Sequence, residues 1–123
     1  MEKVVLDTNI LIEILKGNEK VINKLESFSF KYAISSITAM ELYYGALNKA
    51  ELIQLQKFIS LFEVVELSEN ISKVARELVF KYAKSHNLDI PDSLIAATAI
   101  DNDLKLYTLN IRDFKYINGL VLL

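Results

Sequence analysis

Short apolar runs that alternate with helical patterns constrain the fold of this chain more than any other feature of its sequence. Runs rich in β-branched and aromatic residues, bounded by polar ones, are typical of buried strands. They occur at residues 4–6, 32–34, 64–65, 104–108 and 120–123. Short buried strands joined by helices form a parallel sheet that is covered on both faces. We therefore predict an α/β fold with a central parallel sheet.

Apolar residues at helical spacing fill the intervals between these runs. Ser68 is a favourable residue just before a first helical turn, and Pro91 suits a first helical position. The predicted helices cover residues 10–17, 18–28, 38–47, 50–61, 69–84 and 91–101. Because the 123 residues contain no linker and no internal repeat, the sequence indicates a single domain over residues 1–123.

The composition leaves carboxylates as the only candidate metal ligands. The chain has no cysteine and a single histidine, His86, which excludes thiolate sites and multi-histidine zinc sites. The net charge of −2 argues against broad affinity for nucleic acid, although a bound cation reverses the sign of an acidic pocket. No apolar run is long enough to span a bilayer and no signal-peptide pattern opens the chain, so we expect a cytoplasmic protein without membrane contact.

Acidic residues follow the predicted strands or lie near the starts of helices. Asp7 directly follows the first strand, Asn110 and Asp113 follow a later one, and Glu41 and Asp92 lie early in predicted helices. The carboxyl ends of parallel strands share one edge of a sheet, so we expect the carboxylates to gather there. Such a cluster is destabilising unless a cation neutralises it, and oxygen ligands favour Mg²⁺ or Mn²⁺. Metal-assisted phosphodiester chemistry is the natural use of this site.

Each of these acids also has a purely structural interpretation. Asp7 is a favourable N-cap, and Glu41 completes a capping-box pattern with the threonine three positions before it. Asp92 suits the positive end of a helix dipole, and the segment 110–113 suits a turn. For each acid considered alone, the structural interpretation is at least as good as a role in a functional site. The shared position at one edge of the predicted sheet favours the site.

Four motifs become specific when their order and spacing are taken together. They are Val5-Leu6-Asp7-Thr8-Asn9, Ser35-x-x-Thr38-x-x-Glu41-Leu42-x-x-Gly45, Asp92-Ser93-Leu94-Ile95-Ala96-Ala97-Thr98-Ala99 and Thr108-x-Asn110-x-x-Asp113-Phe114. This set resembles the PIN-domain ribonucleases, and the compact chain resembles the VapC-type toxins of toxin-antitoxin pairs. The resemblance covers nearly the whole chain. It implies a three-layer α/β/α fold and a Mg²⁺- or Mn²⁺-dependent endoribonuclease that forms homodimers and is inhibited by a small antitoxin protein.

The resemblance also implies roles for individual residues. Asp7, Glu41 and Asp92 are expected to bind the metal and to act in catalysis, with Glu41 orienting or deprotonating the attacking water. Many relatives have Asp at the position where this chain has Asn110, so Asp113 is expected to take over the role of the fourth acid. The expected supporting or substrate-facing residues are Thr8, Asn9, Ser93, Thr108, Asn110 and Arg112.

Two other functions remain open from the sequence. A catalytically inactive PIN-like module would use the pocket only for binding, and Asn110 in place of an acid is the feature that favours it. A haloacid-dehalogenase-type phosphatase also has a first strand ending in Asp, but it needs a second acid two positions on, where this chain has Asn9. The segments 47–62 and 71–82 hold more apolar residues than a small core absorbs, which is consistent with a homodimer.

Overall fold

The computed structural model describes residues 1–123 and contains one four-stranded sheet whose strands are all parallel. Val5 lies near the middle of this sheet, paired with Ala33 on one side and Leu106 on the other. The strands are β1 (Lys3–Leu6), β2 (Lys31–Ser35), β3 (Glu63–Val65) and β4 (Lys105–Tyr107), in the spatial order β3-β2-β1-β4. The predicted parallel sheet is therefore confirmed.

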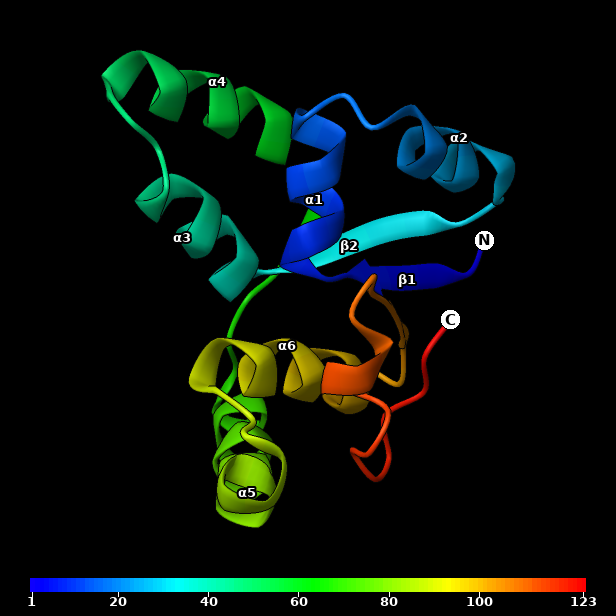
Figure 1. The fold of residues 1–123 in the computed structure, drawn as a ribbon, viewed down its shortest axis with the longest axis vertical. Coiled ribbons are helices and arrows are strands. Elements are labelled where there is room, and N and C mark those ends of the chain that lie inside the picture. Colours follow the sequence, from blue (N-terminus) through cyan, green and yellow to red (C-terminus); the bar gives the residue numbers. More distant parts are fainter.

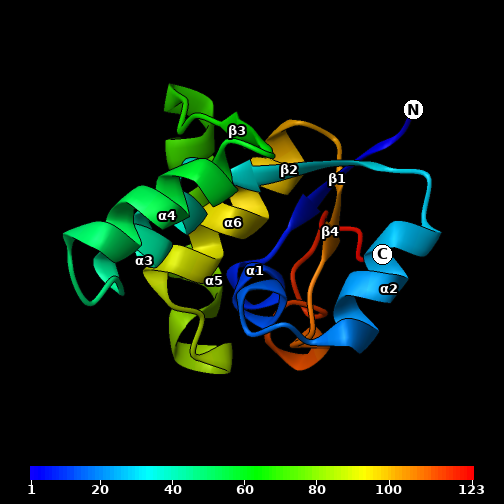
Figure 2. The same cartoon turned by 90° about the horizontal axis from the view of Figure 1, so that it is seen from above.

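Helices cover both faces of the sheet and give a three-layer α/β/α fold (Figure 1). One face carries α1 (Thr8–Leu15), α2 (Glu19–Ser27), α3 (Ser36–Tyr44) and α4 (Lys49–Ile59), and the other carries α5 (Glu69–His86) and α6 (Ile90–Asp101). Seen from above, α1 lies between α2 and the pair of α3 and α4 (Figure 2). None of the helices has the length and apolar character needed to cross a membrane.

Two apolar clusters, one on each face of the sheet, form the core. Val4 and Leu6 of β1 contribute to the cluster under α1 to α4, whereas Val5 contributes to the cluster under α5 and α6. Side chains alternate between the faces of a strand, and a strand in the middle of a covered sheet is buried on both. All three side chains are fully buried. The uninterrupted apolar run of the first strand is thus explained by its central place.

Polar caps set the starts of the helices. Ser68 caps α5 as predicted, its Oγ accepting a hydrogen bond from the backbone N–H of Ile71 at 3.1 Å. The predicted start of α3 at residue 38 is wrong. That helix begins at Ser36, because Ser35 directly follows β2 and its Oγ accepts a hydrogen bond from the N–H of Ile37 at 3.3 Å. Thr38 is instead buried within the helix.

The last predicted strand, residues 120–123, is not a regular strand. It makes a single isolated bridge, between Leu106 of β4 and Leu122. The N–H of Leu106 donates to the carbonyl of Val121 and its carbonyl accepts from the N–H of Leu123, both at 2.9 Å. The chain reaches this edge through a turn at Gly119, whose φ of +89° is in the left-handed region, and β4 itself is only three residues long. The contact with β4 is therefore limited to one bridge.

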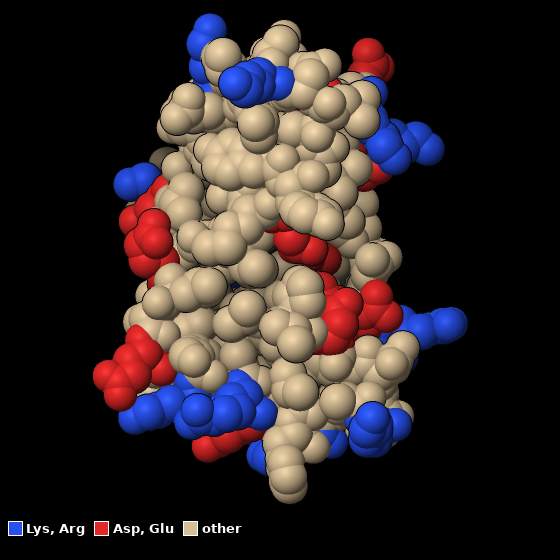
Figure 3. Space-filling model, turned by 90° about the vertical axis from the view of Figure 1, so that its left-hand side faces the viewer, with Lys and Arg blue, Asp and Glu red and all other residues tan.

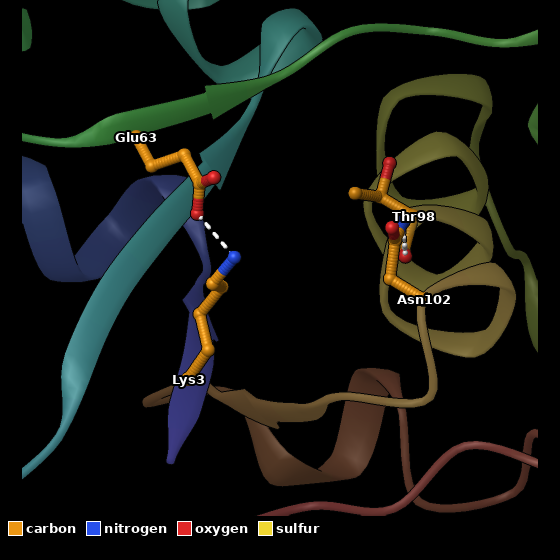
Figure 4. Close-up of polar contacts among 4 residues, drawn as sticks. All are labelled: Lys3, Glu63, Thr98 and Asn102. Atoms are coloured by element: carbon orange, nitrogen blue, oxygen red, sulfur yellow. Dashed lines mark hydrogen bonds and ion pairs between the residues drawn. The ribbon is translucent and has the colours of Figure 1, made fainter. Parts of the chain in front are cut away.

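The amino edge of the sheet carries an ion pair that crosses a strand (Figure 4). The Nζ of Lys3 on β1 lies 2.7 Å from an Oε of Glu63 on β3, across the intervening β2. The β2 residue paired with Glu63 is Ala33, whose small side chain leaves room for this contact. At the nearby end of α6, the side-chain amide of Asn102 donates to the carbonyl of Thr98 at 2.8 Å. The charges of Lys3 and Glu63 are thus paired at this edge.

Candidate active site

Four segments meet at the opposite, carboxyl edge of the sheet. Asp7 directly follows β1, Glu41 lies in α3 after β2, and Asp113 ends a short 3₁₀ helix, η1 (Ile111–Asp113), after β4. Asp92 comes from the first turn of α6. The charges of Asp7, Asp113 and Glu41 all raise the pKa of Asp92, so the four predicted acids lie within electrostatic range of one another.

Asp7 is a buried carboxylate with a hydrogen bond to each oxygen. It is 4% exposed; its Oδ1 accepts from the backbone N–H of Thr8 at 2.8 Å, and its Oδ2 accepts from the hydroxyl of Thr108 at 2.7 Å. Burial raises its pKa, the two hydrogen bonds oppose this, and the charges of Glu41 and Asp113 raise it further, with a raised pKa as the net result. Asp7 is therefore the N-cap of α1 and still has oxygen lone pairs available for a cation.

Glu41 is held by a relay of two threonine hydroxyls. The hydroxyl of Thr8 donates to Oε1 of Glu41 at 2.8 Å, and its oxygen lies 2.9 Å from that of Thr38. A hydroxyl has one proton, so Thr38 must donate to Thr8 when Thr8 donates to Glu41. The capping-box interpretation of Glu41 is wrong, because Ser35 caps α3 and Glu41 lies in its second turn.

Asp92 is the most electrostatically strained of the four acids. Burial, followed by the charges of Asp89, Asp7, Asp113 and Glu41, raises its pKa from 3.8 to about 7. Asp89, which is not among the predicted site residues, caps α6: its Oδ1 accepts a hydrogen bond from the backbone N–H of Asp92 at 2.8 Å. Its signal was present, since an aspartate two positions before a proline at a helix start is a common cap pattern.

Residues 108–113 bring one acid and three other polar side chains to this edge. The backbone N–H of Asn110 donates to the hydroxyl oxygen of Thr108 at 2.9 Å, while the Asn110 side chain makes no cap to η1. Asn110, Arg112 and Asp113 are all exposed. Of the two candidates for the fourth acid, Asp113 is the one whose charge acts on both Asp7 and Asp92.

Asn9 and Ser93, two other predicted site residues, differ in whether their side chains have a hydrogen-bond partner. The Oδ1 of Asn9 is buried and is the only such side-chain atom in the structure without a hydrogen-bond partner. An orphaned buried acceptor is expensive, so it calls for a ligand. Ser93 is also buried, but its hydroxyl donates to the carbonyl of Ile90 at 2.6 Å and lines a groove between α5 and α6. Its side chain is used within the helix rather than toward the acids.

The acids at this edge have no cationic partner. All four ion pairs of the structure join other residues, and none includes Asp7, Glu41, Asp92 or Asp113. The strands in Figure 1 run toward the side that faces the viewer in Figure 3, where acidic atoms occupy the middle of the face. Most lysine and arginine atoms on that face lie toward its upper and lower ends (Figure 3).

These donors fit a hard divalent cation. They are carboxylate oxygens without counter-charges, and oxygen ligands suit Mg²⁺ and Mn²⁺. No three acids are arranged as a ready-made ion cage, although they are close enough to raise the pKa of Asp92. A bound cation would relieve the mutual repulsion that raises this pKa.

Two hollows of the surface lie away from the acids. One at the amino edge is lined by residues that include Lys3, Asp103 and Lys105, and another follows α5 around Arg76 and Phe80. Neither contains any of the four acids.

A comparison with protein families decides the classification. The model of the PIN domain matches residues 4–120, which is nearly the whole chain. The chain belongs to the PIN-domain family. The resemblance that the motifs indicated is therefore confirmed, and so is the three-layer fold that it implied.

Characterised relatives place this PIN domain beside VapC proteins. It is 35% identical to ribonuclease VapC1 of Rickettsia felis, over 97% of this chain and 93% of that one. It is 30% identical to the tRNA(fMet)-specific endonuclease VapC of Shigella flexneri, over 98% of this chain and 96% of that one. Its structure resembles a chain in the crystal structure of VapBC2 from Rickettsia felis bound to promoter DNA, with a TM-score of 0.82 and 31% identity over 98% of this chain and 97% of that one.

Proposed function

We propose that this PIN domain is a Mg²⁺- or Mn²⁺-dependent endoribonuclease and the toxin of a VapBC-type pair. The observation that carries the proposal is the gathering of Asp7, Glu41, Asp92 and Asp113 at one sheet edge without cationic partners. Burial, the charge of Asp89 and the charges of the other three acids together raise the pKa of Asp92 to about 7. Relatives named as ribonuclease and endonuclease VapC, similar along nearly their full length, support the nuclease class.

The four acids are the proposed ligands of the divalent ion. Asp7 and Asp92 would hold it, and Glu41 and Asp113 would complete the acidic surroundings. When bound, such an ion polarises a phosphate oxygen and lowers the pKa of a coordinated water. Thr108 keeps one oxygen of Asp7 in a fixed position by its 2.7 Å hydrogen bond.

Glu41 is the proposed acceptor of the proton from the attacking water. The hydroxyl of Thr8 occupies Oε1, which leaves Oε2 free to orient the water and take its proton. The water oxygen bonds to phosphorus as the bond from phosphorus to the leaving oxygen breaks, and that oxygen receives a proton from solvent. No covalent intermediate with the protein is required.

RNA is the proposed substrate because relatives similar along nearly the whole chain are named as a ribonuclease and a tRNA-specific endonuclease. The exposed side chains of Asn110 and Arg112 would lie beside the RNA backbone. Arg112 takes part in none of the structure's ion pairs, so its guanidinium is free for a phosphate. A net charge of −2 means that the ion, rather than a basic surface, must attract the scissile phosphate.

A small antitoxin and a second copy of the chain are the proposed protein partners. Large apolar side chains stand in solvent around α3 and on α5, with Tyr44 94% exposed, Leu47 87% exposed and Phe80 90% exposed. Exposed apolar surface of this kind is typical of protein interfaces. The solved structure of a VapBC complex among the structural neighbours supports an antitoxin partner.

Two alternatives are less favoured. A binding module without activity would have no use for a buried acid such as Asp92 with its pKa raised to about 7, although Asn110 in place of an acid remains consistent with it. A haloacid-dehalogenase-type phosphatase conflicts with the family assignment and with the amide at Asn9.

The test is cleavage of RNA by the purified protein, using total tRNA and a single-stranded RNA as substrates. We expect cleavage that chelation abolishes and that Mg²⁺ or Mn²⁺ restores, and loss of it in Asp92→Asn. Lys3→Gln is the matched control, because it removes a charge at the amino edge and leaves the acids untouched. RNA cleavage that continues after chelation, or full cleavage activity in Asp92→Asn, would contradict the proposal.

A further inference from the structure

Three aromatic rings form a compact group at the end of α5. The imidazole of His86 stacks on the ring of Tyr116, with centroids 4.0 Å apart and planes 12° from parallel. Tyr82 lies edge-on to both, at 5.7 Å from His86 and 5.1 Å from Tyr116. The hydroxyl of Ser85 is 2.8 Å from Nδ1 of His86 and fixes the rotation of the imidazole. The rings are therefore held in place before any ligand arrives.

This group lies beside the acidic edge. His86 ends α5 three residues before Asp89, and Tyr116 comes three residues after Asp113. Burial, together with the charges of Asp92, Asp113 and Asp89, raises the pKa of Tyr116. The phenol of Tyr116 is thus within electrostatic range of the acids on one side and in ring contact with His86 on the other.

Packing of the C-terminal segment explains only part of the group. Tyr82 ties that segment to α5, because its hydroxyl oxygen accepts the backbone N–H of Asn118 at 3.2 Å. His86 has no such bond to the segment and is exposed to solvent. Tyr116 covers one face of the exposed imidazole. The other face of the imidazole is the surface on which a planar ligand would stack.

A planar ligand is also what the charge of this edge favours. The acids have no cationic partners and repel the phosphates of a polynucleotide everywhere except at a bound ion. Stacking of a base on an aromatic ring adds affinity that does not depend on charge and tolerates any base. Recognition of single-stranded RNA commonly uses bases stacked in this way on Tyr, Phe, Trp or His.

We propose that His86, backed by Tyr116 and held by Tyr82, is a stacking site for a nucleobase of single-stranded RNA adjacent to the scissile phosphate. This inference rests on the proposed ribonuclease function and adds the site that positions its substrate. His86 is a positioning residue here and takes no part in proton transfer.

The chain contains no tryptophan, so His86→Trp provides a single fluorescent reporter at the site. We expect oligouridylate mixed rapidly in Mg²⁺ to quench this fluorescence saturably, while polyphosphate, which has no bases, does not. Leu61→Trp is the matched control, because Leu61 is 76% exposed and lies just before β3 at the opposite edge of the sheet. Its fluorescence should not respond to oligouridylate.

Cleavage kinetics provide the second readout. Loss of one stacked base should raise the KM of His86→Ala about 5- to 100-fold with little change in kcat, and His86→Phe should restore the wild-type KM. Thermal unfolding midpoints of both variants identify any effect that comes only from packing.

The outcomes separate the stacking site from the ribonuclease function. If the wild type cleaves RNA with metal but the His86→Trp fluorescence and the KM of His86→Ala do not change, the stacking site is wrong and the function stands. If RNA quenches His86→Trp but no variant cleaves RNA, the stacking site is supported and the function is overturned. If RNA neither quenches the reporter nor is cleaved, both are overturned.

Discussion

The hydroxyl of Thr108 donates a 2.7 Å hydrogen bond to Oδ2 of Asp7, across 101 positions of sequence. The two residues directly follow the neighbouring strands β4 and β1, so the pairing of those strands brings them together. Both side chains are buried. This contact links the fold to the site, because the strand register fixes the orientation of a proposed metal ligand.

Replacing Thr108 with Val should weaken metal binding. Asp7 would lose the donor at Oδ2, its pKa would rise further, and loss of a hydrogen bond to a metal ligand typically lowers affinity about 10- to 100-fold. The buried carboxylate oxygen left without a donor should also cost about 1–3 kcal/mol of stability. Calorimetric titration with Mn²⁺ measures the affinity. Thr108→Ser retains the hydroxyl, so equal losses in Ser and Val variants would show that the bond to Asp7 is unimportant.

Thr8→Val should impair turnover more than metal binding. It removes the hydroxyl that donates to Oε1 of Glu41, and it leaves the buried hydroxyl of Thr38 without its partner. Because the position of a general base controls its efficiency, we expect kcat to fall about 10-fold or more. Single-turnover cleavage measures this, with Thr8→Ser as the control that keeps the relay. Unchanged kcat in Thr8→Val would remove Glu41 from the proposed role.

Asp92→Asn should stabilise the metal-free protein at neutral and alkaline pH. The folded-state pKa of Asp92, about 7, exceeds its ordinary 3.8, so the folded protein binds this proton more tightly than the unfolded chain. The stability that this pKa shift contributes is therefore fully present below pH 3.8 and is lost as the pH rises through 7. Asn cannot ionise, so this loss disappears; after allowance for solvent screening we expect a gain of roughly 1–2 kcal/mol at about pH 8. Denaturant unfolding at both ends of this pH range measures it, and the gain should vanish in acid.

Asp89→Asn should lower the pKa of Asp92. The charge of Asp89 is the largest of those that raise it, and Asn is as good an N-cap as Asp, so α6 keeps its start. The side-chain carboxyl resonance of Asp92, followed through a pH titration by NMR, measures the change. Asp103→Asn is a suitable control, because Asp103 lies at the opposite edge of the sheet and does not contribute to this pKa. An unchanged titration of Asp92 in Asp89→Asn would contradict the electrostatic description of the site.

Much of the fold could be predicted because it depends on local patterns. Two predictions were correct: the buried strand at Val4-Val5-Leu6 and the helix cap at Ser68. Burial on both faces of a strand and N-cap chemistry each require particular residue types, so both can be recognised in the sequence. The strand at residues 120–123 could not be excluded in this way. An apolar run says nothing of whether its neighbour is long enough to pair with it, and β4 offers a bridge only at Leu106.

The gathering of the acids at one sheet edge was predictable, but the hydrogen-bond network around them was not. Asp7 and Asp92 could be found from their places after a strand and at a helix start. The bond of Thr8 to Glu41 joins positions 33 residues apart and depends on how α1 and α3 pack, which no local pattern encodes. The same holds for the stack of His86 on Tyr116, which brings the end of α5 against the segment after η1.

The most direct test is the Mn²⁺-induced change in thermal unfolding of the chelated wild type and of Asp92→Asn, each compared with its own metal-free midpoint. At a metal concentration of 100 times Kd, binding should stabilise the wild type by about 2.7 kcal/mol, or roughly 10 °C, and the variant by much less. A saturable rise confined to the wild type would establish that these acids bind the ion on which the proposed ribonuclease depends. The same small change in both proteins would contradict it.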